Sequence, residues 1–90
     1  MILITVIISF VFSASLQEAY DNASSLYGYD KYVLLNPDSV YYGGLGLYEG
    51  NTMIDGQGAI INLEGGTGIW VYGSSEYPCN LDIKKVNEEL

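Results

Sequence analysis

From residue 32 onward, the chain alternates short apolar runs with residues that favour turns. Each run is three to six residues long and closes at Gly, Asn, Asp or Pro, which is typical of strands and turns rather than of helices. The pattern predicts strands at Tyr32 to Leu35, Val40 to Tyr42, Leu45 to Tyr48, Thr52 to Ile54, Ala59 to Leu63, Ile69 to Tyr72 and Leu81 to Val86.

The order of these strands repeats along the chain. The first three predicted strands align with the next three at a spacing of about 20 residues, and the insertion Gly65-Gly66 lengthens the last spacing. The aligned pairs are Tyr32 to Leu35 with Thr52 to Asp55, Val40 to Tyr42 with Ala59 to Leu63, and Leu45 to Tyr48 with Gly68 to Tyr72. Such repeats are typical of solenoids, so we expect two stacked coils and the start of a third at Leu81.

Burial explains why such a repeat should stack. Each strand is too short and each coil too thin to shield its inward side chains, so these side chains gain cover only from a neighbouring coil. The predicted inward residues are Val33, Leu35, Ile54, Ile61 and Leu63. The predicted corners, where positive φ is common and a Cβ would clash with the next coil, hold Gly43, Gly44, Gly56, Gly58, Gly65 and Gly66.

Residues 1–15 have the order of a secretory signal peptide. An apolar run of about 11 residues, Ile2 to Phe12, precedes the small residues Ser13, Ala14 and Ser15, and a polar stretch follows. The run is shorter than the roughly 20 residues of a membrane-spanning helix. No Lys or Arg precedes it, and a buried β-branched strand is the alternative. We predict cleavage after Ala14 or Ser15, a secreted or cell-surface protein, and no stable membrane span afterwards.

Residues 16–30 are expected to cap the repeat. Polar residues interrupt a mixed helical spacing of apolar residues before the turn at Gly28. The apolar positions are Leu16, Ala19, Ala23 and Leu26. A short helix or an irregular cap is the best interpretation. The predicted organisation is therefore a signal peptide over 1–15, a cap over 16–30 and the start of an all-β solenoid over 31–90.

Composition and charge narrow the classes of partner and site. Eleven Asp and Glu residues stand against three Lys and no Arg, for a formal net charge of -8. Phosphate backbones would be repelled, so nucleic acid is not expected as a partner. With one Cys and no His, neither a disulfide framework nor a zinc site is expected, and no cofactor is implied. Cys79 is either a buried apolar residue, which we favour, or an exposed thiol able to cross-link.

Three segments resemble right-handed parallel β-helix proteins of the pectin-lyase-like family. The segment TMIDGQGAIINL at 52–63 resembles a turn near the start of such proteins, GIWVYGSS at 68–75 resembles the strand after it, and YVLLNPDSVYYGG at 32–44 resembles the coil before it. The resemblance covers residues 28–86. It implies a right-handed parallel β-helix, of which this chain holds the two to three N-terminal coils.

The resemblance also implies a class of activity and places that activity outside this chain. Proteins of this family are secreted and often cleave or bind acidic polysaccharides, by acid/base hydrolysis or by calcium-assisted elimination. Their catalytic residues lie in later coils, and the paired Asp, Gly-His-Gly and Arg-x-x-Lys motifs are absent from this sequence. We therefore expect a truncated β-helix without a catalytic residue.

The acidic residues are the candidate catalysts and metal ligands. Asp55 is the most attractive carboxylate, but a glycosidase needs a second carboxylate about 5 to 10 Å away, so a turn-stabilising role for Asp55 or Gln57 is favoured. Calcium needs several oxygens that converge on one ion, whereas Asp38, Glu49 and Glu64 are scattered over predicted loops. Solvated charge is the better interpretation, and no metal site is predicted.

Aromatic residues give the one positive indication of binding. Alternation places Ile69 and Val71 on one face of a strand and Trp70 and Tyr72 on the other, so one of these pairs must point outward. Outward Trp70 and Tyr72 would form a platform on which sugar rings stack. Further candidates for this platform are Tyr41, Tyr42 and Tyr48. Ladder packing between coils is the alternative role of the same side chains.

The residues leave three functions open. The first is a secreted β-helix fragment without a catalytic site, with a structural or interaction role, which self-associates or binds further coils through the sheet edge at Leu81 to Val86. The second is a carbohydrate-binding or surface-adhesion module that holds a polysaccharide on Trp70 and Tyr72. The third is the N-terminal cap of a polysaccharide lyase or hydrolase whose remaining coils come from another chain.

Overall fold

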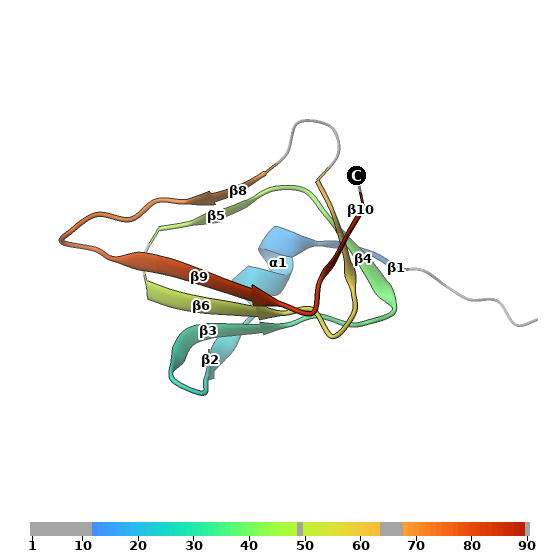
Figure 1. Cartoon of the computed structure of the whole chain (residues 1–90), viewed down its shortest axis with the longest axis horizontal. Coiled ribbons are helices and arrows are strands. Elements are labelled where there is room, and N and C mark those ends of the chain that lie inside the picture. The colour runs from blue at the N-terminus through green and yellow to red at the C-terminus, as the bar shows by residue number, and fades with distance from the viewer. Residues whose placement is uncertain (1–11, 49, 64–67, 90) are drawn as a thin grey trace, which may run out of the picture.

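The computed structural model describes residues 12–48, 50–63 and 68–89, and the fold is rich in β-strands (Figure 1). One short helix, α1 (Leu16–Asp21), lies near the N-terminal end of the described chain. The strands are β1 (Phe12–Ser15), β2 (Ser24–Leu26), β3 (Tyr29–Leu34), β4 (Ser39–Tyr42), β5 (Leu45–Leu47), β6 (Gly50–Asp55), β7 (Ile60–Asn62), β8 (Ile69–Val71), β9 (Cys79–Lys84) and β10 (Asn87–Glu89). All seven strands predicted from the sequence are present with shifted ends, whereas β1, β2 and β10 were not expected.

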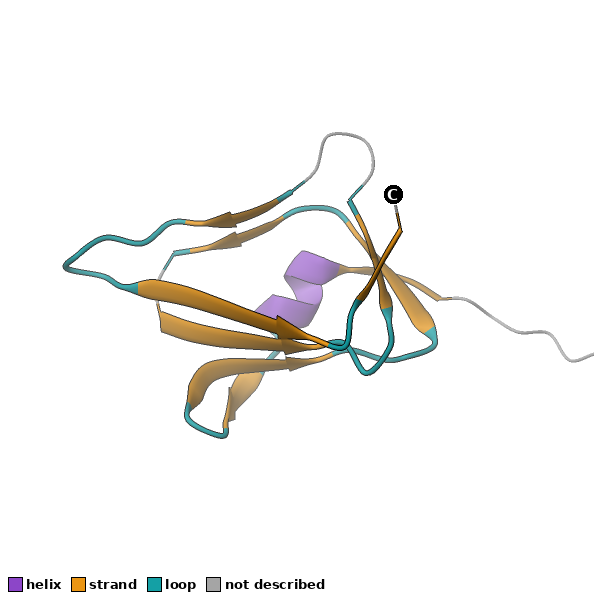
Figure 2. Ribbon diagram, in the orientation of Figure 1, coloured by secondary structure: helices purple, strands orange, loops and turns teal. Residues whose placement is uncertain are grey.

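The strands form three sheets, which the chain visits in a fixed order (Figure 2). Sheet 1 has the order β2-β3-β6-β9, sheet 2 has the order β1-β4-β7-β10, and sheet 3 consists of β5 and β8. The chain therefore builds layers: β3, β4 and β5 form the first layer, β6, β7 and β8 the second, and β9 and β10 the third. Within the described residues, every strand pair is parallel except β2 with β3, which is antiparallel.

Successive layers pair one residue away from the alignment expected from the sequence. In β3 and β6, Val33 lies beside Ile54, whereas the alignment set it beside Met53. The other two strand pairs are shifted by the same step, with Val40 beside Ile60 and Leu45 beside Ile69. Side chains alternate between the two faces of a strand, so only the observed register keeps the inward residues Val33 and Ile54 on the same face.

Burial of the core falls towards the third layer. Val33 in β3 and Ile54 in β6 are 1% and 0% exposed, whereas Ile83, at the corresponding position of β9, is 46% exposed. Of the other predicted inward residues, Leu35 and Ile61 are buried and Leu63 is partly buried. Full burial of such a side chain is worth about 1.5 to 3 kcal/mol, so the third layer lacks stabilisation that the first two have.

Two of the glycines predicted at corners have a left-handed backbone. Gly43 and Gly58 have φ values of 90° and 92°, a region that residues with a Cβ rarely adopt. Gly56 is needed for a different reason, because an added Cβ would lie 2.6 Å from Cγ2 of Val86 in the next layer. Gly65 and Gly66, also predicted at corners, lie outside the described residues.

The elements β1, α1 and β2, here called the N-terminal cap, cover the first layer. β1 pairs with β4, β2 pairs with β3, and the Gln17 side-chain oxygen of α1 accepts a hydrogen bond from the Gly46 N–H of β5 at 3.2 Å. Lys31 Nζ donates to the Tyr20 and Asp21 carbonyls at the end of α1, at 2.9 and 3.2 Å. Each strand of the first layer therefore has a neighbour on its N-terminal side.

Part of the predicted signal peptide contributes to this cap. Residues 1–11 lie outside the described residues, but Phe12–Ser15 form β1, and Ala14 packs against the core. The Ser15 hydroxyl oxygen accepts a hydrogen bond from the Glu18 N–H at 3.3 Å and caps α1. Cleavage after Ser15 would therefore remove both β1 and the cap of the helix.

Candidate functional site

Three of the aromatic residues singled out from the sequence lie together in or directly after the strands of sheet 3. Trp70 and Tyr72 are 47% and 51% exposed, and Tyr48 at the end of β5 is 70% exposed. The rings of Tyr48 and Tyr72 are stacked, with centroids 5.1 Å apart and planes 14° from parallel. We call Tyr48, Trp70 and Tyr72 the aromatic strip. The rings of Tyr48 and Tyr72 are therefore both stacked between layers and exposed to solvent.

Glycines in β5 and its flanks make room for the Trp70 ring. Trp70 pairs with Gly46 in the neighbouring strand, so no side chain stands beside it there. A Cβ added at Gly44 would lie 2.7 Å from Cζ3 of Trp70, which shows that the indole lies directly against this glycine. The indole is thus held against the backbone while about half of its side chain stays exposed.

A shallow depression of about 600 Å³ adjoins the aromatic strip. Its lining residues are Tyr48, Val71, Tyr72, Gly73, Ser74 and Tyr77. Tyr77 is 57% exposed and is held by a turn in which its N–H donates to Ser74 Oγ at 2.9 Å. Tyr77 is not among the residues predicted from the sequence, because it lies in a loop, where strand alternation gives no signal. The strip and depression together offer apolar ring faces beside hydroxyl groups.

The remaining aromatic candidates are not part of this surface. Tyr41 is buried in the core, and its hydroxyl oxygen accepts a hydrogen bond from the Asn36 N–H at 2.8 Å, so its role is structural. Tyr42 is 46% exposed but lies in β4, on sheet 2. Only Tyr48, of the three further candidates, joins Trp70 and Tyr72.

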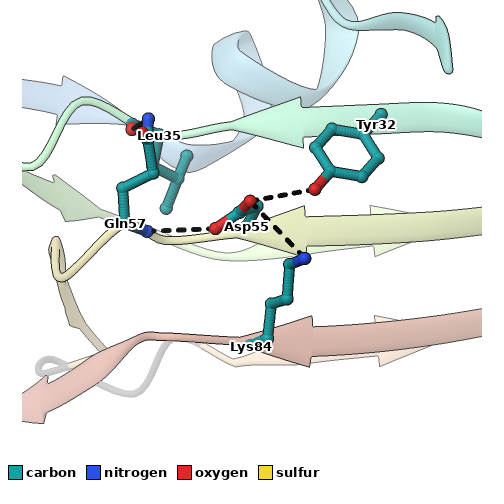
Figure 3. Close-up of polar contacts among 5 residues, drawn as sticks. All are labelled: Tyr32, Leu35, Asp55, Gln57 and Lys84. Atoms are coloured by element: carbon teal, nitrogen blue, oxygen red, sulfur yellow. Dashed lines mark hydrogen bonds and ion pairs between the residues drawn. The ribbon is translucent and has the colours of Figure 1, made fainter. Parts of the chain in front are cut away.

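Asp55 ties together three strands of sheet 1 (Figure 3). Its carboxylate, 8% exposed, accepts a hydrogen bond from the Tyr32 hydroxyl of β3 at 2.9 Å and forms an ion pair with Lys84 of β9 at 3.7 Å. The Gln57 N–H donates to its other oxygen at 3.3 Å, and the Gln57 amide donates to the Leu35 carbonyl at 2.9 Å. The turn-stabilising role predicted for Asp55 and Gln57 is confirmed by these contacts.

The environment of Asp55 favours its charged form. Burial alone would raise the pKa of this carboxyl group, but the Tyr32 and Gln57 hydrogen bonds and the charges of Lys84 and Lys85 outweigh it and lower the pKa below 3.8. A general acid needs the opposite shift, towards neutral pH. Asp55 is therefore suited to hold strands together rather than to donate a proton.

The other acidic residues assemble no metal site in the described part of the chain. Asp38 is exposed, and its N–H donates to the Asn36 side chain at 2.9 Å. Glu49 and Glu64 lie outside the described residues. Among the described residues, no group of three His, Cys, Asp or Glu side chains could hold a metal ion. Cys79, for which burial was favoured, is partly buried and packs against the core.

The third layer leaves an apolar opening at the end of the stack. A cavity of about 300 Å³ is lined there by Ile61, Leu63, Ile69, Ile83 and Val86. The strands β8, β9 and β10 are each the last of their sheet among the described residues. We call this cavity and these three strand edges the open end. It contrasts with the opposite end of the stack, which the N-terminal cap covers.

Comparison with known proteins assigned no relative. No protein-family model, curated protein or solved structure matched the chain. A search of the described residues for a helix long and apolar enough to cross a membrane gave none. Functional inference therefore depends on the open end and the aromatic strip themselves.

Proposed function

We propose that this chain is a structural and interaction module, formed by the capped N-terminal layers of a right-handed parallel β-helix and exported from the cell without a catalytic site of its own. The chain passes through three sheets in the same order in the first two layers and through sheets 1 and 2 again in the third. Five of the parallel strand pairs join consecutive layers. The resemblance of residues 52–63 to pectin-lyase-like proteins supports the same architecture.

The asymmetry of the two ends carries this proposal. At the N-terminal end, β2 pairs with β3 and Gln17 of α1 satisfies the Gly46 N–H, two contacts that lie outside the predicted signal peptide. At the other end, Ile83 is 46% exposed beside an apolar cavity of about 300 Å³. Apolar side chains and unpaired strand edges gain most when further β-strands cover them, so this end is suited to bind β-structure.

Engineered disulfides test the stacked layers directly. Asn51 and Asn80 are register partners in β6 and β9, and their side-chain amides are hydrogen-bonded at 2.9 Å. In a Cys79→Ser background, Asn51→Cys with Asn80→Cys should oxidise readily. The matched control, Asn51→Cys with Asp82→Cys, places the second thiol two residues further along β9 and should not. Equal cross-linking of both pairs, measured by mass spectrometry, would reject the stacking.

Glycan binding by the aromatic strip is a second candidate function. The exposed, stacked pair Tyr48 and Tyr72 beside the half-exposed Trp70 favours it, because sugar rings stack on aromatic faces. A polysaccharide array should give a signal that Trp70→Ala and Tyr72→Ala each lower about tenfold, as expected for a loss of about 1.4 kcal/mol. Tyr42→Ala, an exposed tyrosine on another sheet, is the control. An array without signal would reject this function.

A further inference from the structure

We propose that the glycan held by the aromatic strip is a neutral polysaccharide, and that it continues from the strip into a second depression at the starts of β3, β6 and β9. This inference rests on the second candidate function, glycan binding, and adds to it the class of polysaccharide and a further subsite. The second depression takes residues from all three layers, so it does not depend on the open end.

The second depression, here called the polar depression, has the size and lining of a small-ligand site. Its volume is about 640 Å³, and ligand sites commonly have about 300 to 1,000 Å³. Residues of α1, of the three strand starts and of the loop between β8 and β9 line it. The lining includes the polar and aromatic side chains Tyr20, Asp30, Asn51, Glu76, Tyr77 and Asn80.

One carboxylate and two amides form a row across the layers of sheet 1. Asn51 and Asn80 are register partners, and Asn80 Nδ2 donates to Asn51 Oδ1 at 2.9 Å. In the first layer, Asp30 Oδ2 accepts a hydrogen bond from the Asn51 N–H at 2.8 Å. The next residue of β6, Thr52, is buried, so alternation along the strand directs Asn51 outward. All three side chains of the row are exposed.

The chemistry of this row matches the hydroxyl groups of a sugar. A hydroxyl group both donates and accepts hydrogen bonds, and an amide side chain offers both kinds of partner, whereas a carboxylate accepts only. A carboxylate has about four acceptor sites and an amide has two donors and two acceptor sites, so the bonds within the row use only part of this capacity. The rings of Tyr20 and Tyr77 add apolar faces for the C–H groups of a sugar ring.

The charge of the polar depression selects against acidic sugars. Asp30 and Glu76 are exposed carboxylates in its lining. Lys31 also lines it, but its Nζ donates to the Tyr20 and Asp21 carbonyls at 2.9 and 3.2 Å and lies 4.6 Å from the centre of the Tyr20 ring. The chain as a whole has a formal net charge of -8, so a polymer of uronic acid would be repelled. A neutral polysaccharide carries no such penalty.

Tyr77 connects the polar depression to the aromatic strip. It lines both this depression and the shallow one beside Tyr48 and Tyr72. Backbone hydrogen bonds hold the loop that carries Tyr77, between β8 and β9 (Figure 1), at both ends: the Tyr72 N–H donates to the Leu47 carbonyl and the Gly50 N–H to the Pro78 carbonyl, each at 2.8 Å. A loop that is already fixed loses little conformational freedom on binding, which favours affinity.

Calorimetric titration of the full chain tests both the class and the subsite. The probes are linear hexasaccharides of glucose, of mannose and of galacturonic acid, each with a chelator present. At least one neutral hexasaccharide should bind about tenfold more tightly than the galacturonate, because like charges oppose the latter. Asn80→Ala should weaken neutral binding about fivefold through lost hydrogen bonds. Asp82→Ala, two residues further along the same face of β9 and outside the lining, is the control.

A change that improves binding excludes misfolding as the cause. Glu76→Lys replaces an exposed carboxylate in the lining by a cation, so it should tighten galacturonate binding about threefold. Galacturonate binding that matches neutral binding, no effect of Asn80→Ala, or no gain from Glu76→Lys would each overturn this inference.

The remaining variants separate this inference from the proposed functions. If Trp70→Ala lowers glycan binding while Asn80→Ala does not, the aromatic strip stands as a binding surface and only the polar depression is rejected. If no hexasaccharide binds, this inference is overturned as well. The disulfide between Asn51→Cys and Asn80→Cys reports on the stacked layers in either case.

Discussion

At the scale of single residues, the buried carboxylate of Asp55 holds strands of different layers together through polar contacts. Asp55 joins Tyr32, Gln57 and Lys84 across three neighbouring strands (Figure 3). The sequence alone indicated the Gln57 contact, because an Asp just before a turn amide is a local motif. It could not indicate Tyr32 or Lys84, which lie in other layers and reach Asp55 only through the register between strands.

Replacing Asp55 should destabilise the fold. Asp55→Ala leaves the Tyr32 hydroxyl and the Gln57 N–H without their acceptor, so we expect a loss of about 2 kcal/mol in the free energy of unfolding. Tyr32→Phe removes one hydrogen bond and should cost about 1 kcal/mol. Urea titration measures both losses. Asp38→Ala, an exposed change, should stay within about 0.5 kcal/mol, and a similar loss in that variant would contradict the role of Asp55.

The same carboxylate should make stability depend on pH in the acid range. The pKa of Asp55 is lower in the fold than its ordinary value of 3.8, so its stabilising contribution is fully present above that value. It is lost as the pH falls through the lowered pKa of the folded state. Asp55→Asn should therefore reduce the loss of stability between neutral pH and about pH 2, measured by thermal unfolding. An unchanged pH profile would contradict this assignment.

At the scale of elements, the apolar runs located the strands but did not fix their partners. Seven strands follow from runs closed by turn residues, whereas β2 (Ser24–Leu26) and β10 (Asn87–Glu89) carry no apolar alternation. Their extended form comes from pairing with β3 and β7, which a local pattern does not reveal. The alignment of repeats was one residue off because it matched strand starts, whereas the structure matches inward residues such as Val33 and Ile54.

The link between α1 and β3 gives a prediction at this scale. Lys31 Nζ donates to two carbonyls at the C-terminal end of α1, a position where a cation also interacts favourably with the helix dipole. Lys31→Met should lower the free energy of unfolding by about 1 kcal/mol, measured by urea titration. Glu76→Gln removes a charge from an exposed loop and serves as the control. Equal stability of the two variants would show that the link to α1 contributes nothing.

At the scale of the whole molecule, burial and pairing decline from the first layer to the third. The repeat in the sequence predicted parallel layers, and parallel pairing joins every consecutive pair of layers among the described residues. The sequence also placed Trp70 and Tyr72 on one face of a strand. It could not show that Tyr77 would lie beside them, since that contact depends on how the loop after β8 folds back.

Hydrogen exchange should follow this decline. β6 has a partner strand on each side, whereas β9 has a partner only in β6 among the described residues. We expect the amides of β6 to exchange at least tenfold more slowly than those of β9 in dilute solution, measured by NMR. Faster exchange in β6 than in β9 would contradict the order of the layers.

The position of the cap also bears on the order of synthesis. A ribosome releases β1, α1 and β2 before β3, and the partner positions of β3 in β6 emerge only with the next layer. β2 and β1 gain their partners once β3 and β4 emerge, and each later strand then pairs with a strand that has already left the ribosome. Assembly of this kind would proceed in one direction, from amino to carboxyl terminus, with every intermediate exposing a single growing surface.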